Sequence, residues 1–133
     1  AICMLALFFV LFETTYEILY DFRDLDGDAL LHVPTYPVVH GPDIAEKIMR
    51  GLLLSSGLVL GIGAVFGVLG VRELLFAVAP LVQFVFYRAR LVRGLTSQDC
   101  LWLTHVGSAQ LVLFLVGTAL WKSAGLPENI FLR

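Results

Sequence analysis

Two long stretches without a single charged residue constrain this chain more than any other feature. Residues 51–71 and residues 101–121 each run for 21 residues without Asp, Glu, Lys or Arg. About 20 consecutive apolar residues are needed to carry a helix across the hydrocarbon core of a bilayer. We therefore expect both stretches to be transmembrane helices.

The composition supports a membrane environment. Of the 133 residues, 59% are hydrophobic and 15% are charged, whereas about a quarter of the residues in a soluble domain are charged. The basic residues form no extended stripe beside aromatic residues, which argues against nucleic acid as a partner. Cys3 and Cys100 lie far apart and predict neither a disulfide framework nor a metal site.

Two further segments are expected to cross the membrane. Residues 74–87 form a short span that flanking residues extend, and Pro80 should kink it. Residues 1–12 are continuously apolar but too few to cross alone, so the span either continues as a helix through residue 20 or is truncated. Because the chain begins at Ala1 inside this run, we expect the sequence to be part of a longer protein.

The predicted fold is all-α, a polytopic transmembrane helical bundle with three full spans and one N-terminal span. It forms a single membrane domain over residues 1–133, with an N-terminal helix at 1–20 and an Asp-rich polar loop or partly helical cap at 21–47. Three transmembrane helices follow at 48–121, and a tail at 122–133. Two glycine pairs of small-xxx-small spacing, Gly57/Gly61 and Gly63/Gly67, predict close helix packing.

The basic residues predict the orientation of this multi-pass protein. Cytoplasmic loops carry an excess of Lys and Arg. The Asp-rich segment and the connection after residue 87 share one side of the membrane and carry six basic residues, against Arg72 on the turn between them. We therefore expect the Asp-rich segment on the cytoplasmic or equivalent side; the six are Arg23, Lys47, Arg50, Arg88, Arg90 and Arg93.

Three aspartates form the candidate site. Asp21, Asp24 and Asp28 are spaced three and four apart, so a helix would place them on one face. Their mutual repulsion is relieved by a hard cation such as Mg²⁺. Arg23 lies beside them and could reach a phosphate, whereas Asp26 falls off that face. A solvated acidic helix end is the alternative interpretation.

A calcium-binding EF-hand is excluded by spacing. If Asp24 were the first position of the loop, the required glycine would fall at Ala29 and the bidentate glutamate at Thr35.

The run from Glu17 to Asp28, followed by the run from Thr35 to Gly41, resembles the second Asp-rich motif of UbiA-type intramembrane prenyltransferases. That pattern is roughly E-I-x-x-D-x-x-D-x-x-G-D, then T-L-P-V and a glycine. The matching residues are Glu17, Ile18, Asp21, Asp24, Gly27, Asp28, Thr35, Pro37, Val38 and Gly41. His32 stands where the family has glycine and Tyr36 where it has leucine, and the family's first motif, N-D-x-x-D, does not occur in this sequence.

The resemblance implies transfer of a polyprenyl group from its diphosphate to a lipophilic acceptor. It implies Mg²⁺ held by Asp21, Asp24 and Asp28, with Arg23 contacting the substrate. The chain looks like the C-terminal part of such an enzyme, catalytic only with a missing N-terminal half. The alternative is a non-catalytic membrane subunit, derived from this fold and packed among neighbouring subunits in a larger complex. An unrelated transporter component is disfavoured by the motif.

Other polar residues are expected to serve the fold. Arg88, Arg90 and Arg93 are expected to anchor the chain at the membrane surface. Gln83 is predicted to donate a hydrogen bond between helices, and His105 to pack with a hydrogen bond of its own. Glu13 and Glu17 are expected near the membrane surface. Intramembrane acids are functional candidates by default, but a position at a helix end makes Glu13 a weak one.

Overall fold

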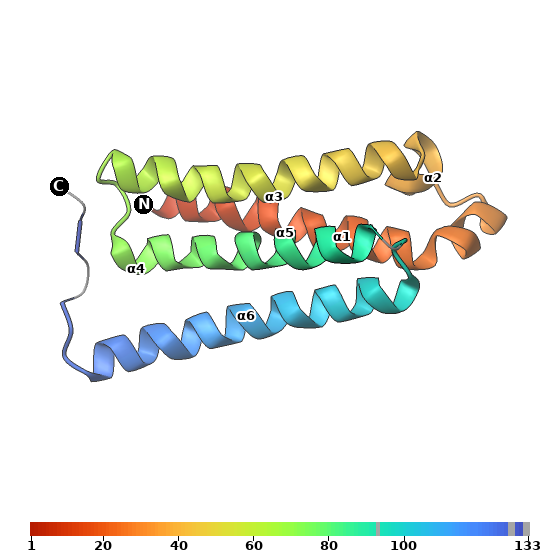
Figure 1. Ribbon diagram of the computed structural model, residues 1–133. Coiled ribbons are helices and arrows are strands. Elements are labelled where there is room, and N and C mark those ends of the chain that lie inside the picture. The colour runs from red at the N-terminus through yellow and green to blue at the C-terminus, as the bar shows by residue number, and fades with distance from the viewer. Residues whose placement is uncertain (93, 128–129, 132–133) are drawn as a thin grey trace.

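The computed structural model describes residues 1–92, 94–127 and 130–131, and this part of the chain contains helices but no strand (Figure 1). The elements, in chain order, are α1 (Ile2–Leu31), α2 (Tyr36–His40), α3 (Pro42–Val65), α4 (Val71–Leu74), the 3₁₀ turn η1 (Leu75–Ala77), α5 (Val78–Leu91) and α6 (Ser97–Ser123).

Four helical segments are long and apolar enough to cross a membrane. They are Ile2–Leu31, Pro42–Val65, Val71–Leu91 (in which α4, η1 and α5 run on from one another) and Ser97–Ser123. The expected all-α transmembrane bundle is therefore confirmed, and the protein is a multi-pass membrane protein. The N-terminal span is long enough to cross by itself, because α1 has 30 residues.

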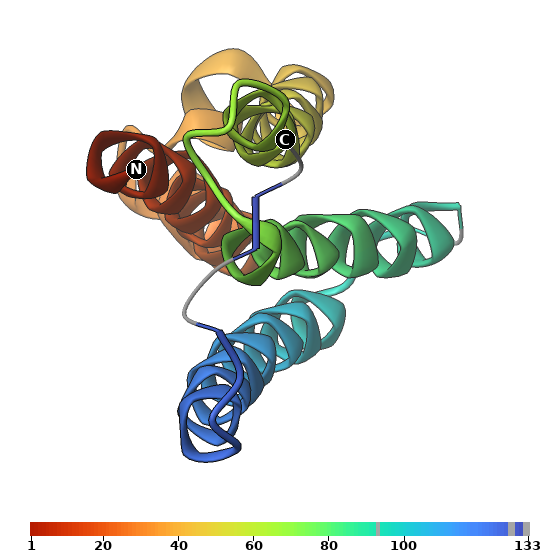
Figure 2. The same cartoon turned by 90° about the vertical axis from the view of Figure 1, so that its left-hand side faces the viewer.

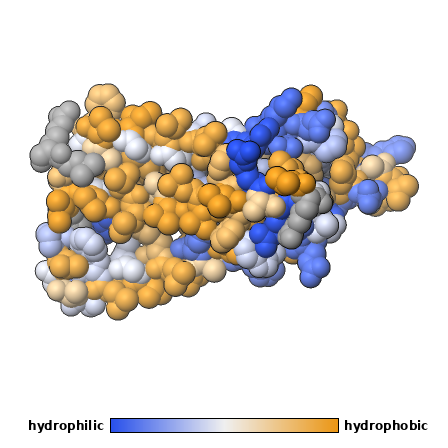
Figure 3. All heavy atoms as spheres, viewed as in Figure 1, coloured by the Kyte–Doolittle hydropathy of each residue, from blue (hydrophilic) through white to orange (hydrophobic). Residues whose placement is uncertain are grey.

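The long helices run up and down beside one another. α1 packs against α3 and α6, and α5 packs against α3 and α6, so the four are arranged around one another (Figures 1 and 2). Apolar side chains cover most of the surface seen in Figure 3, and hydrophilic side chains gather at the end that carries α2. This end, called the polar end below, holds the C-terminus of α1 and the beginnings of α3 and α6.

Aromatic side chains of α1 form much of the interior. Phe8, Phe12 and Tyr16 are buried one turn apart, with ring centroids 5.6 Å apart for Phe8–Phe12 and 5.2 Å for Phe12–Tyr16. Tyr16 lies directly against Gly107 of α6, where an added Cβ would overlap the Tyr16 hydroxyl and ring. Gly107 thus permits the contact between α1 and α6, although its sequence context gave no sign of this role.

The predicted glycine pairs behave differently from the expectation. A Cβ at Gly57 would touch the Pro80 ring at 3.9 Å, whereas one at Gly61 would meet nothing within 4 Å. The closest packing on α3 is at Gly63, where a Cβ would lie 2.6 Å from Leu69. Gly67 lies beyond the end of α3 at φ +65°, so the predicted Gly63/Gly67 helix pair is wrong.

The uncharged run 51–71 is not one helix. α3 begins upstream at Pro42 and ends at Val65, and residues 66–70 turn the chain back. A left-handed conformation suits a glycine because it has no Cβ to clash with the following carbonyl, and Gly67 supplies one at this turn. Uncharged composition identified the span but not its end, because turn residues there are apolar too.

The Asp-rich segment is more helical than a loop. α1 continues past residue 20 to Leu31, and α2 and the first turns of α3 occupy most of the remainder up to residue 47. Pro34 explains where α1 stops, because the residue before a proline is disfavoured in the α conformation. The expected boundary at residue 20 therefore moves to Leu31.

The irregularity expected at Pro80 lies just before it. A proline has no N–H to donate to the carbonyl four residues back, and its ring crowds that carbonyl. For Pro80 that carbonyl belongs to Phe76, which lies in the middle of η1. The span therefore changes from α to 3₁₀ geometry for one turn and then resumes as α5.

Candidate functional site

The candidate site is built on the last turns of α1, which two contacts hold at the polar end. The backbone N–H of Tyr36, at the start of α2, donates to Asp21 Oδ2 at 3.4 Å. The Ser97 hydroxyl, at the start of α6, donates to the backbone carbonyl of Arg23 at 3.0 Å. Segments far apart in sequence thus fix the end of α1 that carries the aspartates.

Five acidic residues recur along α1 at intervals of four, four, three and four residues, which places them on one face of the helix. We call this the acidic face; its members are Glu13, Glu17, Asp21, Asp24 and Asp28. The buried residues of α1 lie on the opposite face and are Phe8, Phe12, Thr15, Tyr16, Ile18 and Leu19. The acidic face therefore points away from the buried side of α1, although Asp21 on it accepts a hydrogen bond from the start of α2.

Like charges meet along the acidic face. Asp21 lies within electrostatic reach of three other carboxylates, those of Glu17, Asp24 and Asp28. Asp21 and Asp28 are half-buried, whereas Asp24 is exposed. Because α1 continues as a helix to Leu31, the three aspartates share one face, as predicted. The repulsion among them favours a bound cation.

Arg23 is paired within the site. Its Nε donates to Asp24 Oδ1 at 2.8 Å, its Nη2 contacts Asp24 Oδ2, and its guanidinium lies 4.9 Å from the centre of the Tyr20 ring. The Asp24 carboxylate is therefore occupied by a neighbour in sequence. Asp21 and Asp28 form no ion pair with any residue that the structure describes.

The donor set suits half of a magnesium site. Within the described part of the chain, no three His, Cys, Asp or Glu side chains come close enough together to enclose a metal ion. Mg²⁺, however, is usually held by one or two carboxylates together with waters and substrate phosphates. Asp21 and Asp28 lie about 10 Å apart along the axis of α1, so each can supply one carboxylate to Mg²⁺ when further ligands come from outside this face.

The backbone explains two positions of the sequence motif. His32 ends α1 in the left-handed conformation, at φ 57° and ψ 33°, which is the conformation that favours glycine at the end of a helix. This conformation is a physical reason for the glycine that the family pattern has at this position. His32 adopts the left-handed conformation at an energetic cost. Gly41, which matches the pattern, has φ +83° just before α3.

The structure also shows the surroundings of the other polar residues discussed in the sequence analysis. Arg90 Nε lies 3.0 Å from Asp99 Oδ1, and its guanidinium lies 3.5 Å from the Trp102 ring centre, so it fastens α5 to α6. Arg88 is exposed, and Arg93 lies outside the described residues. Gln83 donates across to the carbonyl of Leu103 at 3.0 Å, as predicted.

His105 also behaves as predicted. Its Nδ1 lies 2.6 Å from the backbone carbonyl of Leu101 in its own helix. This hydrogen bond gives the imidazole a local partner and does not bring it to the acidic face.

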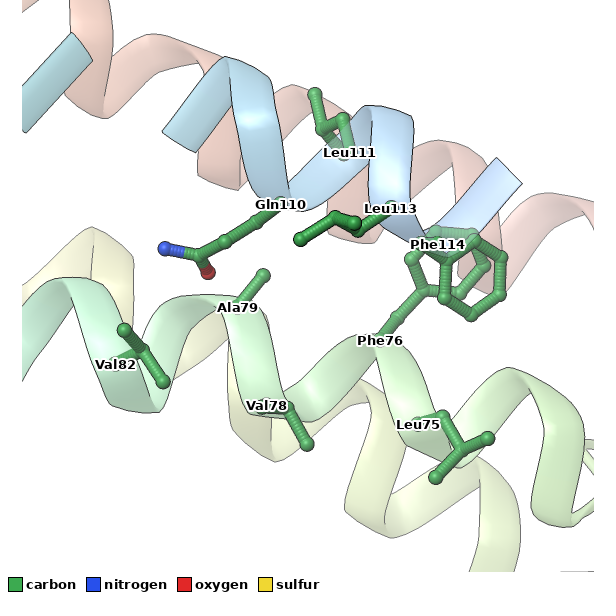
Figure 4. A pocket seen from close by; sticks show the side chains of 9 residues that line it. All are labelled: Leu75, Phe76, Val78, Ala79, Val82, Gln110, Leu111, Leu113 and Phe114. Carbon is green, nitrogen blue, oxygen red and sulfur yellow. The ribbon is translucent and has the colours of Figure 1, made fainter. Parts of the chain in front are cut away.

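An apolar cavity of about 290 Å³ lies between η1–α5 and α6. Figure 4 shows Gln110 as the one polar side chain among those labelled around it, which otherwise come from residues such as Phe76, Val82 and Phe114. The cavity is lined by residues of η1, α5 and α6 and not by α1. It is therefore separate from the acidic face.

Comparison with known proteins identifies the family of this chain. A model of the UbiA prenyltransferase family matches residues 1–106, a range that contains the whole acidic face. Neither the curated proteins nor the solved structures that were compared with the chain include a match.

Proposed function

Since this chain belongs to the UbiA prenyltransferase family, we propose that its acidic face forms one side of a metal–diphosphate site. The reaction is transfer of a polyprenyl group from its diphosphate to a lipophilic acceptor. The observation that carries this proposal is the direction of the acidic face, which points away from the buried side of α1.

The length of α1 places part of the acidic face within the membrane. Thirty helical residues span about 45 Å, whereas the hydrocarbon core is about 30 Å thick. With the apolar N-terminal residues in the membrane, Glu13 and Glu17 lie at membrane depth and Asp24 and Asp28 beyond it. A charged side chain facing lipid at the helix centre costs about 2.5–3.5 kcal/mol. The acidic face is therefore more stable against protein or a water-filled cavity than against lipid.

The need to cover the acidic face with protein or water also suggests how its carboxylates become part of a complete metal–diphosphate site. A second set of ligands must approach the acidic face from a neighbouring part of the assembly, whether in the same polypeptide or another. When bound there, Mg²⁺ neutralises charge on the diphosphate leaving group. Asp21 and Asp28 are carboxylates that would each ligate Mg²⁺.

The ion pair with Asp24 positions Arg23 to bind the diphosphate. A guanidinium can contact phosphate oxygens through two parallel N–H donors. Asp24 holds the Arg23 side chain at the site by ion pairing. A phosphate can accept hydrogen bonds from the donors that Asp24 does not use, and the remaining carboxylates orient the ion.

The number of basic residues supports placing this site on the cytoplasmic side. The polar end carries most of the chain's Lys and Arg, and the turn at the opposite end carries Arg72. An excess of basic residues marks the cytoplasmic side of a membrane protein.

The experiment that tests the function measures Mg²⁺-dependent prenyl transfer in membranes that contain the native protein. We expect Asp21→Ala and Asp28→Ala each to abolish transfer, because each removes a ligand of the ion. Asp26→Ala serves as the matched control, since Asp26 is an exposed acid of the same helix that lies off the acidic face. Unchanged turnover in the Asp21 and Asp28 variants would refute the assignment.

A non-catalytic membrane subunit is the second candidate function. The same outward direction of the acidic face favours it, because a neighbouring subunit could equally cover these carboxylates. This function predicts that the Asp21 and Asp28 variants alter assembly with the neighbour, and that the wild-type assembly shows no prenyl transfer.

A further inference from the structure

A second pocket lies at the polar end, away from the acidic face. Its volume is about 240 Å³, and it opens between α1, α3 and α5. The residues of α1 that line it, Phe22 and Leu25, lie off the acidic face. The lining side chains on which the argument depends are Phe22, Leu25, Asp43, Glu46, Tyr87 and Leu91.

Tyr87 is the feature that points to a ligand. The residue is 1% exposed, and its hydroxyl has no hydrogen-bond partner among the residues that the structure describes. Buried tyrosine hydroxyls usually find a partner, because an unpaired one loses its hydration without compensation. Tyr87 therefore brings an unpaired hydrogen-bonding group to a residue set that lines a pocket, where a ligand could use it.

Two charged side chains line the pocket, and both are acidic. Glu46 is paired with Arg50, at 3.2 Å between Oε1 and Nε. Asp43 makes no ion pair within the described part of the chain. The N-terminus of α3 and the C-terminus of α5 both flank the pocket, and their opposite partial charges offset each other. One carboxylate charge is left without a partner.

The lining groups discussed here also offer more hydrogen-bond acceptors than donors. The carboxylates of Asp43 and Glu46 only accept, and the Tyr87 hydroxyl is both an acceptor and the one donor among the lining groups discussed here. A ligand that supplies donors without acceptors complements this set. A primary ammonium has three donors and no acceptor.

We propose that this pocket binds a primary ammonium group carried on an apolar body. The ammonium lies between Asp43, Glu46 and Tyr87, and the methylene groups next to it pack against Phe22, Leu25 and Leu91. At the polar end of a membrane protein, such a group comes either from the headgroup of an aminophospholipid or from a free long-chain amine. This inference does not depend on the proposed function.

The test uses decylamine as the probe and decanol as its uncharged analogue. The purified protein is placed in phosphatidylcholine nanodiscs, and bound probe is counted by native mass spectrometry over a concentration series. We expect decylamine to bind at least tenfold more tightly than decanol. Asp43→Asn should weaken decylamine binding about tenfold, and Tyr87→Phe about three- to tenfold, the range expected for one lost hydrogen bond.

Asp26→Asn is the control, since Asp26 is an exposed acid of the same end outside the pocket, and its affinity should equal that of the wild type. Asp43 is exposed, so its variant keeps the test decisive even if Tyr87→Phe fails to fold. Equal binding of decylamine and decanol, or an Asp43→Asn affinity equal to that of Asp26→Asn, would overturn the proposal.

A second arm distinguishes the source of the ammonium. Adding phosphatidylethanolamine to the nanodiscs displaces decylamine if the natural occupant is a lipid headgroup. If displacement requires a free amine instead, the occupant is a soluble or membrane-dissolved long-chain amine. Both results retain the ammonium site.

Discussion

At the scale of single residues, His32 shows how backbone geometry connects a sequence motif to structure. It takes the left-handed conformation at the end of α1, and its Nδ1 lies 3.2 Å from the carbonyl of Ala29. A non-glycine residue pays about 1–2 kcal/mol in this region because its Cβ crowds the following carbonyl. The position therefore favours glycine on physical grounds alone.

This conformation gives a prediction for stability. We expect His32→Gly to raise the free energy of unfolding by about 1 kcal/mol, because the left-handed strain disappears and exceeds the added freedom of the unfolded chain. The measurement is equilibrium unfolding in mixed detergent micelles, with His32→Ala as the control that retains the Cβ. A glycine variant no more stable than the alanine variant contradicts this account of the turn.

The candidate site illustrates how far residue patterns reach. Spacing alone predicted that Asp21, Asp24 and Asp28 share a helix face, because helical periodicity follows directly from residue number. The ion pair of Arg23 with Asp24 was not foreseen, since adjacent residues on a helix do not generally face each other. Glu13 joins the acidic face only because α1 is one unbroken helix, which the sequence left open.

At the scale of elements, the contact between α1 and α6 depends on one glycine. Tyr16 fills the space that a side chain at Gly107 would need. We expect Gly107→Ala to destabilise the folded protein by about 1–3 kcal/mol, the usual cost of overpacking an interior. Gly117→Ala, on the same helix, serves as the control because a Cβ there meets nothing within 4 Å.

Unfolding measured by the same method distinguishes the two glycine variants. If Gly107→Ala is as stable as Gly117→Ala, the close contact of Tyr16 with α6 does not contribute as described.

Element boundaries were less predictable than elements. Three full spans and an N-terminal span of open length followed from hydropathy, because the apolar thickness of a membrane fixes helix length. The ends of α1 and α3 did not follow, because polar residues can continue a helix beyond the membrane and apolar residues can form a turn. Leu31 and Val65 end these helices for local reasons, namely the approach to Pro34 and the turn at Gly67.

At the scale of the whole molecule, the surface of the bundle has two different parts, the acidic face of α1 and the exposed apolar residues of α3. Leu54, Leu58 and Ile62 of α3 are exposed apolar side chains, and Leu58 is 64% exposed, as expected of a side chain in lipid. Glu13 and Glu17 are exposed acidic residues of α1, and the placement of α1 in the proposed function puts them at membrane depth. Two such surfaces require different surroundings in the assembled protein.

Spin labelling can measure these surroundings. A nitroxide attached at Glu17→Cys should be less accessible to oxygen, which concentrates in lipid, than one at Leu58→Cys, because protein or water covers the acidic face. Both native cysteines, Cys3 and Cys100, are first replaced so that a single site is labelled. Equal oxygen accessibility at the two positions would place the acidic face in lipid.

The central claim is the proposal that Asp21 and Asp28 each ligate Mg²⁺ that binds the diphosphate. The most direct measurement is Mg²⁺-dependent binding of a non-reactive polyprenyl thiodiphosphate to the native protein in membranes. We predict that Mg²⁺ tightens binding at least tenfold in the wild type and in Asp26→Asn. We predict that Asp21→Asn and Asp28→Asn lose this dependence. Retention of the full magnesium effect in both site variants would contradict the claim.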